Sequence, residues 1–402
     1  MKLKKVASLS LSLALSLAVL PAVGEAAPQA DLSESKASPM KQVEKGTSDY
    51  VKGEVIVKFK DDVKKSEKSK VIQNMNAKVK PDVDAVESEF DVLEVGNVDA
   101  VAKALSNNPN VEYAEPNYKF NVSWTPNDYY YSGYQYGPQN TYTEQAWNIT
   151  RGSSSQEIAV VDSGVDYTHP DLDGKTIRGY DFVDNDYYPM DENDHGTHVA
   201  GTAAAETNNS TGVAGMAPNT KILAVRALDA NGSGSLANIA DAIRYSADQG
   251  AEVINLSLGC NCDTATLENA VNYAWNKGSV IIAAAGNDGV STTFEPASYA
   301  NVISVGAVDQ YDRKASFSNY GTWVDVTAPG VDIASTVPGG YAYMSGTSMA
   351  SPHVAGLAGL LAAQGKSNWQ IRQDIEQSAD AISGTGYYFE HGRIDSYGAV
   401  SR

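Results

Sequence analysis

Short apolar runs alternate with helical patterns over the C-terminal two-thirds of the chain. Buried runs of this kind, separated by helices, are typical of a parallel sheet covered by helices on both faces. The pattern therefore predicts an α/β domain with a doubly wound, mostly parallel sheet, running from about Trp124 to the C-terminus. The apolar runs are at 158–161, 222–225, 253–258, 280–285 and 302–305, with helical patterns at 236–249 and 265–277 among others.

A different pattern precedes this domain. Residues 28–50 are rich in Ser, Lys, Glu and Pro and are typical of a linker, whereas residues 51–120 mix alternating and helical segments. This mixture predicts a small α+β domain, which contains no Cys, no His and no Gly-rich phosphate loop. Its expected strands are 54–60, 90–95 and 111–115, and its expected helices are 62–76 and 98–107.

The first 27 residues have the pattern of a signal peptide. Lys2, Lys4 and Lys5 precede an apolar stretch over 6–20, and small residues up to Ala27 follow Pro21. The alternative, a membrane anchor, needs about 20 apolar residues, and this stretch is shorter. No other stretch is long enough, so we expect a secreted, extracellular protein that does not remain in a membrane.

Negative charge is concentrated in the C-terminal part. The net charge is -19, and residues 124–402 hold 13 Lys and Arg against 31 Asp and Glu. Binding to nucleic acid phosphates needs clustered Lys and Arg, so a nucleic-acid partner is excluded. Two interpretations remain open: a solvated surface that keeps the protein soluble, or carboxylates that bind cations.

Three residues carry candidate chemistry at expected strand and helix ends. Asp162 ends the run IAVVD, His195 stands in DHGTHVAG, and Ser348 stands in SGTSMASPHVAG. Acyl transfer needs a nucleophile, a base and an acid that orients the base. Ser348 would attack a carbonyl, His195 would take its proton, and Asp162 would hold the His195 tautomer. The free N–H groups at a helix start would favour the oxyanion.

Each residue also has a simpler interpretation. Asp162 could be a turn residue, Ser348 could be a helix N-cap, and His195 with His198 could bind a metal. An α/β-hydrolase is excluded, because it requires G-x-S-x-G and the order Ser, acid, His. The order here is Asp, His, Ser, which is the order given for subtilisin.

The segments VVDSGVDYTHPDL, DHGTHVAG, NLSLG, AAAGND and SGTSMASPHVAG resemble the blocks of the subtilisin family. The segments TPND, FVDND and NYAWNKGSV resemble its thermitase-like branch. The resemblance implies a serine endopeptidase that acts through an acyl-enzyme. It also implies that His195 rather than His198 is the base, and that Asn287 donates its amide to the oxyanion together with the Ser348 N–H.

The resemblance further implies where a substrate binds. Two segments would form the walls of the pocket for the P1 side chain, and a third would pair with the substrate backbone. Main-chain pairing favours broad specificity. We expect a preference for large apolar P1 residues, with modest tolerance of Lys and Arg because Asp288 would lie beside the pocket. The walls are Ser257, Leu258, Gly259 and, opposite, Ala284, Ala285, Gly286; the pairing edge is Gly232, Ser233, Gly234.

By the same resemblance the chain is a precursor with three parts. Residues 1–27 are the signal peptide, 28–123 the propeptide and 124–402 the catalytic domain. Residues 51–120 would be an inhibitory pro-domain that assists folding and then occupies the cleft. Self-cleavage near Ser123–Trp124 would place Phe120 at P4. Proteins and peptides are the expected substrates, the propeptide is the expected intramolecular inhibitor, and the mature enzyme is expected to be a monomer.

Calcium is the expected cofactor, with a role in stability. Asp181, Asp184 and Asp186 form a D-x-x-D-x-D cluster that does not match an EF-hand. The resemblance implies three sites. The first uses Asp128, Asp171 and Asn209 with the carbonyls of Glu206, Thr211 and Val213; the second uses the aspartate cluster with the carbonyls of Tyr188 and Met190; the third uses the carbonyls of Ala297, Tyr299 and Val302.

The two cysteines, Cys260 and Cys262, follow the first P1 wall directly. An even count in a secreted chain suggests a disulfide, which would stiffen the rim of the pocket. Free thiols or an inert link are the alternatives. Two other functions also remain open: an inactive calcium-binding scaffold or adhesin, and a serine esterase.

Overall fold

The computed structural model describes residues 50–81, 88–119 and 124–402, together with the backbone of 18–20. The chain divides into two compact units, residues 27–122 and residues 1–26 with 123–402. Most of the expected signal peptide, Phe120 and Ser123 lie outside the described residues. The expected boundaries at 27/28 and 123/124 stay predictions.

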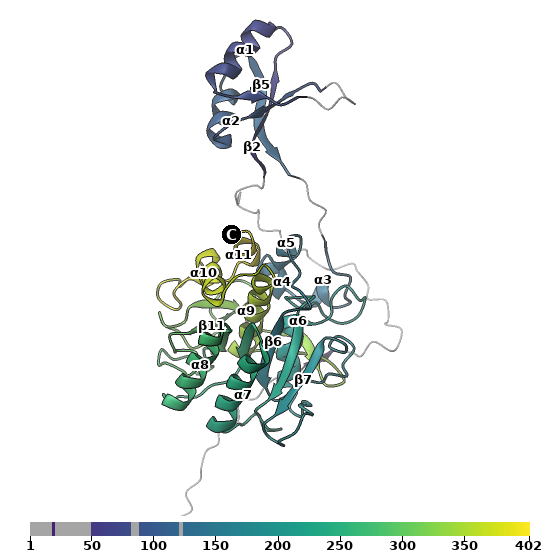
Figure 1. Cartoon of the computed structure of the whole chain (residues 1–402), viewed down its shortest axis with the longest axis vertical. Coiled ribbons are helices and arrows are strands. Elements are labelled where there is room, and N and C mark those ends of the chain that lie inside the picture. Colours follow the sequence, from purple (N-terminus) through teal and green to yellow (C-terminus); the bar gives the residue numbers. More distant parts are fainter. Residues whose placement is uncertain (1–17, 21–49, 82–87, 120–123) are drawn as a thin grey trace, which may run out of the picture. The chain divides into compact units, whose positions relative to one another are not determined.

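The smaller unit is an antiparallel sheet with two helices (Figure 1). The strand order is β3-β4-β2-β5. Val55, Val57 and Phe59 alternate along β2 and are buried with Leu93 and Leu105 in one core. The elements are β2 (Tyr50–Phe59), α1 (Lys65–Asn74), β3 (Lys78–Val79), β4 (Asp91–Glu94), α2 (Val98–Ser106) and β5 (Val111–Tyr118).

An eight-stranded sheet forms the centre of the larger unit. Its order is β15-β12-β11-β10-β9-β6-β8-β7, and every pair is parallel. The strands are β6 (Glu157–Asp162), β7 (Thr176–Asp181), β8 (Lys221–Arg226), β9 (Val253–Leu256), β10 (Val280–Ala284), β11 (Val302–Val308), β12 (Val326–Pro329) and β15 (Gly392–Arg393).

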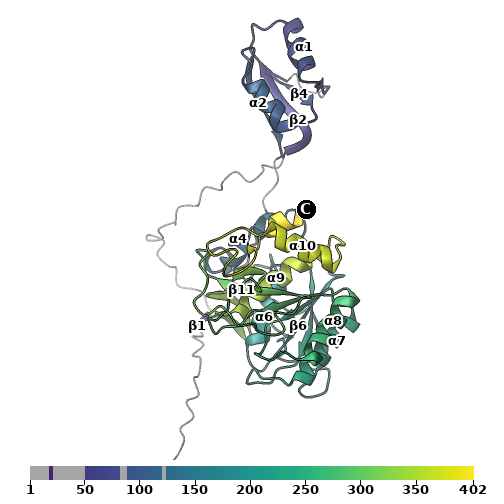
Figure 2. The same cartoon turned by 90° about the vertical axis from the view of Figure 1, so that its left-hand side faces the viewer.

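Helices cover both faces of this sheet (Figure 2). Successive residues of β6 enter different cores: Ile158 and Val160 pack with α6 and α9, whereas Ala159 and Val161 pack with α7 and α8. This alternation is why the strands are apolar throughout. The expected fold, a doubly wound parallel sheet beside a small α+β domain, is confirmed. These helices are α6 (His195–Ala204), α7 (Leu236–Gln249), α8 (Ala265–Lys277) and α9 (Thr347–Ala362).

The remaining elements were not expected from the pattern. A three-stranded sheet has the order β1-β14-β13, and short helices surround the core. None of the helices in the described part of the chain is both long and apolar enough to cross a bilayer. The elements are β1 (Ala18–Leu20), α3 (Tyr131–Tyr134), α4 (Gly137–Asn140), α5 (Thr143–Ala146), β13 (Ile333–Val337), β14 (Gly340–Met344), α10 (Asn368–Ser378) and α11 (Ser396–Val400).

Candidate active site

Asp162 and His195 meet at the carboxyl end of the central strands. Asp162 is the last residue of β6 and is completely buried, and His195 is the first residue of α6. The ring Nδ1 of His195 lies 2.7 Å from Oδ1 of Asp162. Burial works against a charged ring, but the nearby carboxylates outweigh it, so the pKa of His195 is raised above its usual value. The pair can therefore hold one tautomer and stabilise an imidazolium.

A second buried carboxylate, Asp191, connects the chain next to both residues. Its Oδ1 accepts a hydrogen bond from the Ser163 hydroxyl (2.8 Å), and its Oδ2 accepts from the Thr197 N–H (2.8 Å) and hydroxyl (2.6 Å). Ser163 follows Asp162, and Thr197 lies in the first turn of the helix that begins at His195. Asp191 thus fixes the acid and the base relative to each other, and its charge contributes to the raised pKa of His195.

Ser348 is half-buried in the first turn of α9. Its hydroxyl donates to the carbonyl of Ser257 (3.1 Å), so within the described residues it is not hydrogen-bonded to His195. A catalytic hydrogen bond is often long or absent without substrate. A buried chain of hydrogen bonds lies below: Ser351 donates to Asn255 (2.6 Å), Asn255 to Ser257 (2.9 Å), and the Ser257 hydroxyl to the Ser348 carbonyl (2.8 Å).

Asn287 lies against the start of the same helix. Its Oδ1 accepts from the Thr347 N–H (2.8 Å) and from the Thr347 hydroxyl (3.0 Å). The amide nitrogen is consequently the end left to donate. The Ser348 N–H lies in the first turn of α9, where N–H groups have no partner inside the helix. A Cβ added to Gly346 would lie 3.6 Å from Ser348 N and 3.7 Å from Asn287 Nδ2, so this glycine borders both donors.

The other histidines of the core have separate partners. His198 is buried, its Nε2 faces the Ile333 carbonyl at 2.9 Å, and burial lowers its pKa to about 3. Burial likewise lowers the pKa of His353 to about 4, and its Nδ1 faces the Met349 carbonyl. Among the described residues no group of three His, Cys, Asp or Glu is arranged to hold a metal. The interpretation of His195 and His198 as a metal pair gains no support.

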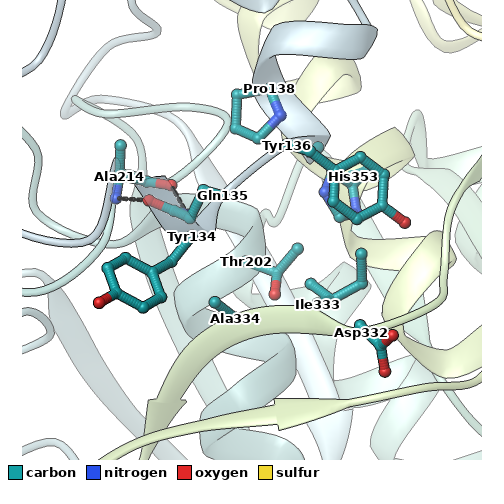
Figure 3. A pocket seen from close by; sticks show the side chains of 11 residues that line it. Tyr134, Gln135, Tyr136, Pro138, Thr202, Ala214, Asp332, Ile333, Ala334 and His353 are labelled. Carbon is teal, nitrogen blue, oxygen red and sulfur yellow. Dashed lines mark hydrogen bonds between the residues drawn. The ribbon is translucent and has the colours of Figure 1, made fainter. Parts of the chain in front are cut away.

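His353 also lines a small hollow behind α9 (Figure 3). Gln135 closes one side of it through two hydrogen bonds with the backbone of Ala214, at 2.8 and 2.9 Å. Its volume of about 10 Å³ has room for one water molecule. None of its lining residues belongs to the Asp162–His195 pair or the Ser348 region, so the hollow is not the candidate active site.

Of the expected substrate-binding residues, Ser257 contacts Ser348 directly, and the Gly286 N–H donates to the hydroxyl of Thr347, the residue before Ser348 (3.1 Å). Both P1 walls follow strand ends, one after β9 and the other at the end of β10. Asp288 is exposed, and its N–H donates to Asn319 (3.0 Å). The edge Gly232–Gly234 is exposed on a turn in which the N–H groups of Asp229 and Gly232 bind the Ser233 and Asp229 carbonyls.

The side chains of the first expected cation site converge. Asp128 and Asp171 are buried. The buried ammonium of Lys175 acts on Asp171 through its charge, but its hydrogen bonds go to the carbonyls of Ala205 and Pro218. Burial raises the pKa of Asp128 to about 6 and also raises the pKa of Asp171. Asn209 donates to Asp171 (2.8 Å). Two buried carboxylates that accept hydrogen bonds from neutral groups suit a cation. Glu206, Thr211 and Val213 lie on the same loop.

At the second expected site a basic side chain is already present. Arg226 is buried and donates to Asp181 (3.0 Å) and to Asp184 (2.7 Å). Asp186 accepts a hydrogen bond from the Tyr188 N–H. A cation bound by the aspartate cluster would compete with Arg226 for Asp181 and Asp184. At the third, the Tyr299 carbonyl already accepts from the Val302 N–H. On the loops expected to hold these two sites, Met190 is half-buried and Ala297 is buried.

Cys260 and Cys262 are paired in a disulfide, with Cα atoms 5.2 Å apart. Glu295 lies against this loop: its N–H and carbonyl both bond to Cys260, at 2.9 and 2.8 Å, and its side chain accepts from the Cys262 N–H. Sequence patterns gave no signal for Glu295, for Asp191, or for the chain through Asn255 and Ser351, because each acts through residues distant in the chain.

Comparisons with known proteins identify relatives over the whole chain. The subtilase family model (Peptidase S8) matches residues 153–398, and a model described as the fervidolysin N-terminal prodomain matches residues 36–117. The chain is 70% identical over 402 residues to "Thermophilic serine proteinase" of Bacillus sp. strain AK1, with 100% of both chains covered. It is 58% identical over 278 residues to "Thermitase" of Thermoactinomyces vulgaris, covering 69% of this chain and 99% of thermitase.

Solved structures also match. A protease from Pseudoalteromonas arctica PAMC 21717 has a TM-score of 0.63 at 32% identity, covering 69% of this chain and 99% of that one. A cold-adapted subtilisin-like serine proteinase has a TM-score of 0.56 at 35% identity, covering 60% of this chain and 90% of its own. With the family model spanning more than half of its residues, the chain belongs to the subtilase family and is a subtilisin-like serine proteinase with an N-terminal prodomain.

Proposed function

We propose that the protein is a secreted, calcium-stabilised serine endopeptidase of broad specificity, made as a self-processing precursor. Ser348 attacks the peptide carbonyl, His195 takes its proton and later donates it to the leaving amine, and Asp162 holds the His195 tautomer. Asn287 and the Ser348 N–H stabilise the oxyanion. The observation that carries this proposal is the 2.7 Å contact between His195 and the buried Asp162, with Ser348 at the start of α9, a helix that shares one core with α6.

The test compares casein hydrolysis by wild type and by Ser348→Ala. We expect casein hydrolysis to be lost in the variant, and a serine-directed fluorophosphonate to label wild type alone. A folded wild type that is not labelled would favour an inactive scaffold. A labelled protein that cleaves esters but not casein would favour a serine esterase.

The broad specificity follows from how the substrate backbone would bind. Gly232, Ser233 and Gly234 lie exposed beside the active site and can pair with an extended peptide. The P1 side chain would enter between Ser257–Gly259 and Ala284–Gly286. Asp288 follows the second wall by two residues and would favour a basic P1 group over an apolar one of similar size. An Arg-to-Leu ratio of kcat/KM that Asp288→Asn leaves unchanged would remove Asp288 from this role.

Calcium would bind first between Asp128, Asp171 and Asn209, where two carboxylates are buried and Asp171 is hydrogen-bonded by the neutral Asn209 amide and Val213 N–H. When bound, the cation supplies charge compensation and stabilises the folded state only. At the second site, Asp181 and Asp184 would bind calcium only by releasing Arg226, so we expect weaker affinity there. The third site, at Ala297, Tyr299 and Val302, offers carbonyls alone.

A calcium titration tests this order of affinities. We expect chelation to raise the thermal inactivation rate of the mature enzyme, and Asp128→Asn to reduce the protection that calcium gives. Asp186→Asn should affect only the weaker site. An inactivation rate that is the same with calcium and with chelator contradicts the stabilising role.

Maturation would remove the first 123 residues in two steps. The signal peptide, residues 1–27, is cleaved on export, and the prodomain inhibits the enzyme until cleavage near Ser123–Trp124. The match to a subtilase prodomain supports the second step. N-terminal sequencing of the secreted enzyme locates the cleavage, and size-exclusion chromatography tests the expected monomer.

The Cys260–Cys262 disulfide would stiffen the rim of the P1 pocket. The loop it closes is too short for much unfolded-state stabilisation. Thiol counting with and without reductant, followed by peptide kinetics, tests both its presence and its effect.

A further inference from the structure

Each expected wall of the P1 pocket ends in a glycine that lies against the side chain of Phe294. Gly259 belongs to the wall after β9, and Gly286 belongs to the wall after β10. Glycine has no side chain, so neither of these two residues fills the space beside it. What lies in that space therefore decides which P1 side chain can enter.

The side chain of Phe294 occupies this space. A Cβ added to Gly259 would clash with Cε1 of Phe294 and come within 2.8 Å of Cδ1. A Cβ added to Gly286 would meet the Asn319 side-chain amide first and would lie 3.1 Å from Cδ1 and from Cγ of the same ring. One aromatic ring therefore lies against the glycine of each wall.

The backbone that carries this ring is fixed to the pocket wall. Glu295, the next residue, exchanges both main-chain hydrogen bonds with Cys260, at 2.8 and 2.9 Å. The Glu295 side chain is buried and accepts from the Cys262 N–H (3.2 Å) and from the Ser298 hydroxyl (2.9 Å). The Phe294 carbonyl accepts from the Ser298 N–H (3.1 Å). The ring can leave the space only by rotating its own side chain.

We propose that Phe294 fills the P1 pocket and makes this protease select small P1 residues such as Ala, Gly and Ser. The proposal rests on the proposed endopeptidase function and specifies its substrate class. A large apolar P1 side chain would have to displace the ring from both walls, losing its packing. A methyl group needs no such displacement. The expectation of a pocket for large apolar residues took no account of Phe294, which lies outside both wall segments.

The experiment measures kcat/KM for two peptide p-nitroanilides that differ only in Ala or Phe at P1. Wild type is compared with Phe294→Ala, with Phe294→Leu as a smaller change, and with Phe182→Ala as a matched control. Phe182 is also partly buried, but its ring packs on Tyr180 and Tyr245. We expect wild type to prefer Ala, and Phe294→Ala to raise kcat/KM for the Phe substrate by about 10- to 100-fold. The Ala substrate and the control should change little.

A wild type that prefers Phe, or a Phe-to-Ala ratio that Phe294→Ala leaves unchanged, overturns the proposal. If Phe294→Ala does not fold, the ratio for Phe294→Leu and the wild-type preference decide the question. Fluorophosphonate labelling separates this result from the proposed function. A labelled enzyme with the wrong P1 ratio contradicts only the role of Phe294, whereas an unlabelled enzyme without peptide hydrolysis contradicts both.

Discussion

The His195 ring is held 2.7 Å from Asp162, a carboxylate without exposure to solvent, while a second buried carboxylate, Asp191, secures the first turn of the same helix. His195, the base of this site, therefore lies near two negative charges, and these favour its protonated form. Its protonation can be read out directly from the pH dependence of the reaction.

The first prediction concerns that pH dependence. His195 works as a base only when neutral, so kcat/KM falls as the pH drops through its pKa. Burial lowers the pKa of His195, but Asp162 and Asp191 raise it by a larger amount. The acidic limb of the pH profile should therefore lie above pH 6.5, the ordinary value for histidine. Asp191→Asn removes one negative charge, so we expect the limb to move to lower pH. A pH profile of peptide hydrolysis measures it.

Thr197→Val is the matched control, because it removes a hydrogen bond to Asp191 and keeps the charge. An equal displacement of the limb in both variants would mean that position, and not charge, sets the pKa. No displacement in Asp191→Asn would remove Asp191 from the electrostatics of the site.

The second prediction concerns Asn287. Its Oδ1 is occupied by Thr347, which directs the amide nitrogen toward the oxyanion. We expect Asn287→Ala to reduce kcat by about 10²–10³ with little change in KM, which is the magnitude known for such a donor in subtilisin. Steady-state kinetics with one peptide substrate suffices. An effect confined to KM would assign Asn287 to ground-state binding.

The third prediction concerns Gly346, whose φ of 165° is extended backbone that any residue adopts. Its added Cβ makes only ordinary contacts, but these include both oxyanion donors. We expect Gly346→Ala to fold normally and to lower kcat by roughly 10-fold, because the methyl group crowds the developing oxyanion. Gly340→Ala, at a glycine with no neighbour within 4 Å, is the control. Full activity in Gly346→Ala would place the oxyanion elsewhere.

The fourth prediction concerns the buried Lys175. Its ammonium donates to the carbonyl of Pro218 and, at 3.4 Å, to that of Ala205, the two ends of the loop that carries the first expected cation site. Burial lowers the pKa of Lys175 to about 7, against 10.5 for a free lysine. Between these two values the unfolded chain binds a proton that the folded protein has released, so stability rises with pH. Below about pH 7 Lys175 is charged in the folded protein as well, so the full free-energy cost of burying its charge opposes folding.

We therefore expect the free energy of unfolding to increase from about pH 7 to about pH 10.5, and Lys175→Met to lose this increase. Urea unfolding of the fluorophosphonate-inactivated enzyme at constant calcium measures it. Lys221→Met, at a neighbouring lysine bound to the Gly174 carbonyl, is the control. The same pH dependence in Lys175→Met and wild type would contradict the assignment.

The sequence predicted those parts of the molecule that are decided locally. The run at 158–161 is apolar because both faces of β6 are covered, and Asp162 is conspicuous because it ends that run. The strand β7 was missed, since it lies at the sheet edge and mixes exposed, half-buried and buried residues. The hairpin β13–β14 was missed for a related reason: its strands contain Ser, Thr and Gly.

Features of the site that depend on contacts through space could not be predicted. Asp191 connects the segments after Asp162 and His195, and nothing in its own neighbourhood indicates those partners. Arg226 ends a buried strand, yet its charge is placed among the aspartates expected to bind calcium. Phe294 fills a gap between two segments that resemble pocket walls, and only the folded arrangement brings the three together.

The main-chain hydrogen bonds between Glu295 and Cys260 do not depend on the side chain at position 294. Substrate recognition can therefore change there while the fold stays stable. The main chain beneath position 294 is held by its neighbours, so the residue displayed there can be exchanged without rebuilding the cleft. A single base change in a phenylalanine codon yields leucine, isoleucine, valine, serine, cysteine or tyrosine, and all of these except tyrosine are smaller than phenylalanine. Natural and directed evolution can thus change the P1 preference of this enzyme through single codon substitutions.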